Sequence, residues 1–270
     1  MALYERISLV VSLVLLGLLA FLLIDLPTRA VELTLLGSPL TLIVSEQWLM
    51  AVLLGGLAGT GTRAIIQGHP GLVYRAQDSS FSFWLLPALL AILVTMLLPW
   101  ASISIISWVI GILGTGALLW FTILAEYHSL MATDRWYRLS HVWLNLVSYS
   151  VALGFFFAIY QSRARSLISA SAVLLVTGLL TISQLRGEPE GSSGKWIFAG
   201  IIALVMAQST WALNYWRIPS LTASLWLLLI YYLFTGLAQQ QILGRLTRRA
   251  VLEYAGVTLV GLAIIFQFVP

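Results

Sequence analysis

Charge is scarce in this chain of 270 residues, since only 9% of them are Asp, Glu, Lys or Arg, whereas 60% are hydrophobic. A soluble domain carries about 25% charged residues. The scarcity excludes a soluble globular protein, and the high hydrophobic content excludes a disordered one. The composition therefore predicts a protein embedded in a lipid bilayer.

Cysteine is absent from the chain. Its absence excludes disulfides, thiolate metal sites, iron–sulfur clusters and a cysteine nucleophile. The net charge is +4, and in a membrane protein such an excess is typical of basic loops at the cytoplasmic face. We therefore expect no nucleic-acid partner.

Long runs without charge predict the membrane spans, because a crossing helix needs about 20 apolar residues. The longest run, residues 79–125, exceeds one span, and Pro99 with Trp100 predicts its division into two. Backbone groups in lipid must bond within their own segment, so these runs predict helices. We expect an all-α polytopic membrane protein, a single domain over residues 1–270 with nine transmembrane helices. The predicted spans are 7–26, 47–66, 81–99, 103–125, 139–160, 166–185, 196–216, 219–244 and 250–268.

The first span is interpreted as uncleaved, because its apolar run exceeds the usual core of a signal peptide; cleavage would leave eight spans. Basic residues set the orientation of such a bundle. With the N-terminus inside and the C-terminus outside, ten basic residues lie in cytoplasmic segments and four lie outside. The ten are Arg6, Arg63, Arg75, Arg135, Arg138, Arg186, Lys195, Arg245, Arg248 and Arg249.

Two connecting segments and the glycines complete the outline. Residues 27–46 contain two β-prone stretches around Gly-Ser-Pro, which predicts a short hairpin-like loop on the outer surface. Residues 187–194 predict a flexible cytoplasmic loop. Gly55 and Gly59 have the spacing that lets membrane helices approach closely, so we expect them to pack inside the bundle.

Polar residues concentrate between the predicted fourth and fifth spans. Glu126 directly ends a long apolar run, where a carboxylate needs a partner. A helix that begins near Thr133 would place four polar side chains on one face, those of Asp134, Arg138, His141 and Asn145. Asp134 and Arg138 are four residues apart, so they could equally form an ordinary ion pair with a structural role. The candidate ligand-binding residues here are Glu126, His128, Asp134, Arg135, Arg138, His141 and Asn145.

A second basic group follows the predicted eighth span. Arg245, Arg248 and Arg249 would meet anionic lipid headgroups at the cytoplasmic face, each contributing about 1 kcal/mol. An anionic ligand such as a phosphorylated lipid is the alternative occupant. Gln208 and Asn214 in the seventh span are expected to be buried and to bond between helices.

No cofactor or metal site is predicted. Glu126 and His128 are two residues apart, so they could bind one metal ion only if the helix had ended. His128 and His141 are expected at helix ends and not facing each other within the membrane, which argues against haem. No metalloprotease motif or other reaction motif is present.

Three segments, AEYH (125–128), ALNYW (212–216) and LAQQQILGRLTRRAVLEY (237–254), resemble a family of bacterial multi-span inner-membrane proteins with no assigned activity. The resemblance implies a setting in the bacterial inner (cytoplasmic) membrane and supplies no catalytic residue.

The absence of a reaction motif favours a non-enzymatic protein, an accessory or scaffold subunit of a membrane assembly that contacts other membrane subunits. The alternative is a transporter, or a lipid-binding or lipid-modifying membrane protein, with a polar pocket near Glu126 at the cytoplasmic face.

Overall fold

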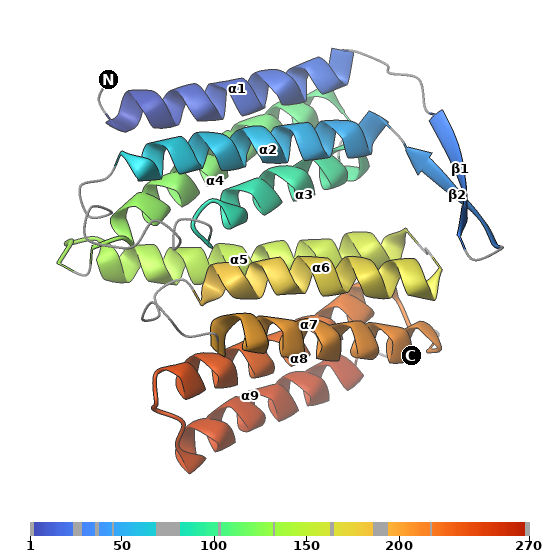
Figure 1. The fold of residues 1–270 in the computed structure, drawn as a ribbon, viewed down its shortest axis with the longest axis vertical. Coiled ribbons are helices and arrows are strands. Elements are labelled where there is room, and N and C mark those ends of the chain that lie inside the picture. Colours follow the sequence, from blue (N-terminus) through green and yellow to red (C-terminus); the bar gives the residue numbers. More distant parts are fainter. Residues whose placement is uncertain are drawn as a thin grey trace. The chain divides into compact units, whose positions relative to one another are not determined.

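The structure is a computed structural model, and it describes residues 3–23, 29–35, 38–44, 46–68, 82–101, 104–131, 133–162, 165–185, 194–216 and 218–267. Within these ranges the chain forms nine α-helices and two β-strands (Figure 1). The chain divides into two compact units, Met1–Val73 with Leu86–Ser140, and Tyr74–Leu85 with His141–Pro270.

The first unit holds four helices and a two-stranded sheet. Its elements are α1 (Leu3–Leu23), β1 (Arg29–Leu35), β2 (Ser38–Val44), α2 (Glu46–Gln67), α3 (Leu85–Ala101) and α4 (Ile105–His128). Helix α1 lies beside α2 and α4 (Figure 1). A Cβ added at Gly61 would lie 2.6 Å from Val10, so this glycine lets α1 and α2 approach closely. Gly55 faces Ile92 of α3 in the same way, which confirms its predicted packing role.

The long apolar run is divided where the proline predicts it. Pro99 lies in the last turn of α3, and its missing N–H leaves the carbonyl of Thr95 without a helical donor. The side-chain amide of Gln47 donates to the carbonyl oxygen of Met96 at 2.8 Å and lies 3.5 Å from that of Thr95. Helix α4 then begins at a capping box, in which Ser104 and Ser107 each accept from the other's backbone N–H.

The two strands lie within the predicted hairpin segment. β1 and β2 pair antiparallel, with Arg29 opposite Val44 and Leu35 opposite Ser38. The other residues of 27–46, apart from Glu46, lie outside the described residues, and so do residues 187–193 of the second predicted loop. Gly194 of that loop begins a helix.

The remaining helices are α5 (Tyr137–Gln161), α6 (Ser166–Gln184), α7 (Gly194–Asn214), α8 (Ser220–Ile242) and α9 (Arg248–Phe266). They belong to the second unit, except for the first turn of α5, up to Ser140, which belongs to the first. Helix α7 packs against both α6 and α8, and α8 packs against α9 (Figure 1). The Asn214 side chain of α7 donates to Ser169 Oγ of α6 at 2.9 Å, so the predicted bond between helices is confirmed for Asn214.

Seven of the described helices, α1, α2 and α4–α8, are long and apolar enough to cross a membrane. Helices α3 and α9 contain shorter apolar stretches, Leu85–Trp100 and Val251–Ile265. The nine described helices fall on the nine predicted ranges. The length and composition of seven described helices are therefore consistent with a multi-pass membrane protein.

Candidate functional site

The polar loop between α4 and α5 is built around one histidine–aspartate contact. His128 lies in the last turn of α4, and its Nδ1 is 2.6 Å from Oδ2 of Asp134. The two side chains are 22% and 27% exposed. The other carboxylate oxygen of Asp134 accepts from the backbone N–H of Trp136 at 3.0 Å. Asp134 thus connects the end of α4 to the start of α5.

The predicted shared face of Asp134, Arg138, His141 and Asn145 is wrong in one respect, because α5 begins at Tyr137 and not near Thr133. Asp134 lies before the helix, where its side chain binds a backbone N–H just upstream of α5. Only Arg138, His141 and Asn145 are helical. Arg138 and Asn145 are exposed, whereas His141 is half-buried.

Arg135 is placed by an aromatic neighbour. Its guanidinium carbon lies 5.1 Å from the ring centroid of Trp136, a distance typical of a cation–π contact. Trp136 is itself 47% exposed. A cation held on an exposed indole suits the interface between lipid and water, where both groups are commonly found.

Glu126 is wholly buried, with 0% exposure. It shares the inner face of α4 with Leu119 and Thr122, which are also completely buried. Because α4 continues through His128, the Glu126 and His128 side chains are separated by about 200° around the helix. The two residues therefore do not converge on one metal ion. Among the described residues, no three His, Asp or Glu side chains form a group suited to a metal.

The second basic group surrounds the turn between α8 and α9. Helix α8 ends in a Schellman motif, in which Gly244 has a φ of 64° and the N–H of Arg245 donates to the carbonyl of Gln240 at 2.9 Å. In α9, Arg249 Nε lies 3.0 Å from Glu253 Oε1, and both side chains are exposed. Arg245 and Arg248 are exposed as well. Their contact with anionic headgroups stays a prediction.

The boundary between the two units divides the first predicted group. Glu126, His128, Asp134, Arg135 and Arg138 belong to the first unit. The others, His141, Asn145, Arg245, Arg248 and Arg249, belong to the second. Within the first unit, the side chains of His128 and Asp134 are in direct contact. Ligand binding by these residues stays a prediction.

One amide departs from its expected position. Gln208 of α7 was expected to be buried, but it is exposed. It lies on the same face as Gly200, Leu204 and Ala212, which are also exposed. The opposite face of α7 carries the buried residues Ala199, Ile202, Ala203, Met206, Thr210 and Leu213. A helix that is apolar on both sides gives no sequence signal for which side is covered.

A buried polar contact between α6 and α8 was not predicted. Tyr231 is completely buried, and its hydroxyl donates to Gln184 Oε1 at 3.2 Å. Tyr149 of α5 lies beside it, with ring centroids 6.0 Å apart, and its hydroxyl is 3.3 Å from Thr235 Oγ1. The tyrosines within the apolar runs, together with Gln184 at a span end, were the available signal.

Comparison with known proteins places the chain in one family. No curated protein and no solved structure matches it. One family model matches residues 26–268, a range that reaches from before β1 to the end of α9. The chain therefore belongs to the family described as protein of unknown function (DUF5656).

Proposed function

We propose that this protein is a non-enzymatic accessory or scaffold subunit of a membrane assembly, and that α7 is the helix that contacts a neighbouring subunit. The single observation that carries this proposal is the exposed amide of Gln208 in a helix long enough to cross the membrane. Such an amide in hydrocarbon loses its hydrogen bonds to water. It is therefore more stable against a partner that can bond to it.

The position of Gln208 along α7 places it within the apolar part of the span. It lies 14 residues after Gly194, which is about 21 Å along the helix, and about 9 Å before Asn214. The part of the chain that the structure describes supplies no hydrogen-bond partner for its side chain. Lipid tails cannot supply one either.

The surrounding surface suits another helix. Gly200, Leu204, Gln208 and Ala212 follow each other at intervals of four, and this spacing forms one stripe along a helix. A Cβ added at Gly200 would meet nothing within 4 Å, so the surface is open there. Small residues let a second backbone approach, and an amide then bonds across the contact. The occupant that we infer is a transmembrane helix of a different subunit with a polar side chain at that depth.

Gln208→Leu is expected to weaken the complex with this partner by about fivefold in dissociation constant, which corresponds to about 1 kcal/mol for one hydrogen bond between membrane helices. The measurement is native mass spectrometry of the protein purified in mild detergent from the membrane of its own host. The chain alone has a mass of 29.7 kDa. The matched control is Gln241→Leu, the same change at an exposed glutamine at the end of α8.

The expected results and the contradicting results are distinct. The proposal predicts a specific heteromeric complex for the wild type and for Gln241→Leu, its weakening in Gln208→Leu, and a thermal midpoint of the isolated chain that does not fall. A complex unaffected by Gln208→Leu would contradict it. A benzophenone maleimide attached to Leu204→Cys provides a photo-crosslink to whatever covers this face. A crosslink to a second copy of this chain, or to lipid alone, would contradict the proposal that a different subunit lies there.

A further inference from the structure

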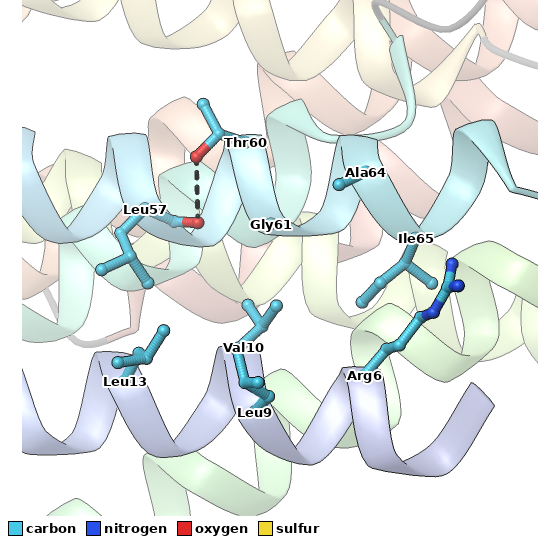
Figure 2. A pocket seen from close by; sticks show the side chains of 9 residues that line it. All are labelled: Arg6, Leu9, Val10, Leu13, Leu57, Thr60, Gly61, Ala64 and Ile65. Carbon is cyan, nitrogen blue, oxygen red and sulfur yellow. Dashed lines mark hydrogen bonds between the residues drawn. The ribbon is translucent and has the colours of Figure 1, made fainter. Parts of the chain in front are cut away.

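A groove between α1 and α2 has a lining that suits a phospholipid, with one basic side chain and an otherwise mostly apolar surface. Its volume is about 390 Å³, within the range of roughly 300–1,000 Å³ found for ligand sites. Figure 2 shows the nine residues that line it, with Arg6 at one end and Leu13 and Leu57 at the other. The lining residues are Arg6, Leu9, Val10, Leu13, Leu57, Thr60, Gly61, Ala64 and Ile65.

The groove exists because the residues of α2 that line its middle have small side chains. Gly61 contributes no side chain, and Thr60 and Ala64 contribute short ones. Buried Val10 and Ile65 form the floor, at 7% and 4% exposure. On the α1 side, Leu9 and Leu13 are 48% and 45% exposed, so the groove opens at the outside of the first unit.

The interior of the groove suits hydrocarbon. Apart from Arg6, the one lining side chain with a polar group is Thr60, and its hydroxyl donates to the carbonyl of Gly56 at 2.7 Å within α2. From Arg6 to Leu13 the groove runs along seven residues of α1, or about 10 Å. The two helices are long and apolar enough to cross a membrane, so this length lies in the same medium as the acyl chains.

Arg6 supplies a charge at one end. It lies in the first turn of α1, and a Cβ added at Gly68, just after α2, would be 3.2 Å from its Nη1. These helix ends place the guanidinium at the lipid–water interface. It is the only ionisable group among the nine lining residues, and a guanidinium binds phosphate oxygens through paired N–H groups.

We propose that this groove binds one phospholipid with a net negative headgroup, with an acyl chain along α1 and α2 and the headgroup phosphate on Arg6. The argument is charge complementarity at one end of an apolar channel in the membrane. A zwitterionic lipid would place its own cation near the same guanidinium, so an anionic headgroup is favoured. This inference does not depend on the partner of α7, because it concerns a different helix pair.

The test uses the purified protein in detergent with equal amounts of phosphatidylglycerol and phosphatidylcholine, followed by native mass spectrometry. The wild type is expected to retain phosphatidylglycerol about fivefold better, the factor expected for one arginine at a membrane surface. Arg6→Gln should reduce this preference several-fold. Arg63→Gln, at an exposed arginine of α2 that does not line the groove, should preserve it.

A second pair of variants tests the apolar part. Ala64→Leu fills the groove and should reduce the retention of both lipids several-fold, whereas Ala117→Leu, the same change at an exposed position of α4, should not. Equal retention of the two lipids by the wild type would overturn the proposal. Equal effects of Arg6→Gln and Arg63→Gln, or of the two alanine variants, would overturn it as well.

A crosslink identifies the occupant directly. Because the chain has no cysteine, Ala64→Cys provides one unique thiol for a benzophenone maleimide in vesicles of phosphatidylglycerol. Irradiation is expected to give a product heavier by one lipid. A crosslink to a second copy, or to another segment of the same chain, would show that protein covers the groove and would overturn the proposal.

Discussion

Gly236→Ala is expected to lower the free energy of unfolding of the purified protein by about 1–3 kcal/mol, the usual cost of overpacking a well-packed contact. A Cβ at this position of α8 would meet the ring of Tyr254 in α9, 2.7 Å from its Cζ. The ring is also held from the side by Tyr232, with centroids 5.4 Å apart. Relief of the clash therefore requires α9 to move away from α8.

The control for this prediction is Gly256→Ala on α9, where an added Cβ would meet nothing within 4 Å. Both changes gain the same helix propensity, about 1 kcal/mol over glycine. Their difference in thermal midpoint therefore reports the contact with Tyr254. Equal midpoints for the two variants would show that α8 and α9 do not pack as described.

Gln184→Met is expected to lower the free energy of unfolding by about 1–3 kcal/mol, because it removes the acceptor of a fully buried hydroxyl. The Tyr231 hydroxyl lies 3.2 Å from Gln184 Oε1, and the two residues are 0% and 7% exposed. Methionine preserves the length and most of the volume of the side chain. The loss therefore measures the hydrogen bond more than the packing.

A double-mutant cycle with Tyr231→Phe separates the pair from its surroundings. The double variant is expected to be more stable than the sum of the single losses predicts, by about 1 kcal/mol, since neither orphaned polar group remains. The measurement is thermal unfolding of the four proteins in one detergent. Additive losses would mean that the hydroxyl and the amide do not bond to each other.

The sequence predicted the helices because the length of each run without charged residues can be compared directly with the length of helix that the bilayer thickness requires. The division at Pro99 also followed from the sequence, since proline lacks the N–H that a helix interior requires. The start of α5 did not follow. A local bond from Trp136 N–H to Asp134 places this carboxylate before the helix, and its other oxygen contacts His128. Charge spacing alone did not distinguish that arrangement from a longer helix.

The two amides of α7 show the second limit. Gln208 and Asn214 are six residues apart, which separates them by about 120° around the helix. Asn214 bonds to Ser169, whereas Gln208 is exposed. Since both faces of α7 are apolar, no hydrophobic pattern distinguished the covered face from the open one. The groove beside Arg6 was missed for a related reason, because it depends on which small residues of α2 face α1.

The central claim is that every one of the nine predicted spans crosses the membrane, and the shorter helices α3 and α9 test it most directly. Gln67, the last residue of α2, and Ser104, the N-cap of α4, precede and follow α3 in the chain, and Thr247 and Gln267 directly flank α9. Each residue is replaced singly by cysteine, and an impermeant maleimide is applied to sealed vesicles of known orientation. We predict labelling of Gln67→Cys and Thr247→Cys from the cytoplasmic side, and of Ser104→Cys and Gln267→Cys from the opposite side. Labelling of both members of either pair from one side would contradict the nine-span architecture.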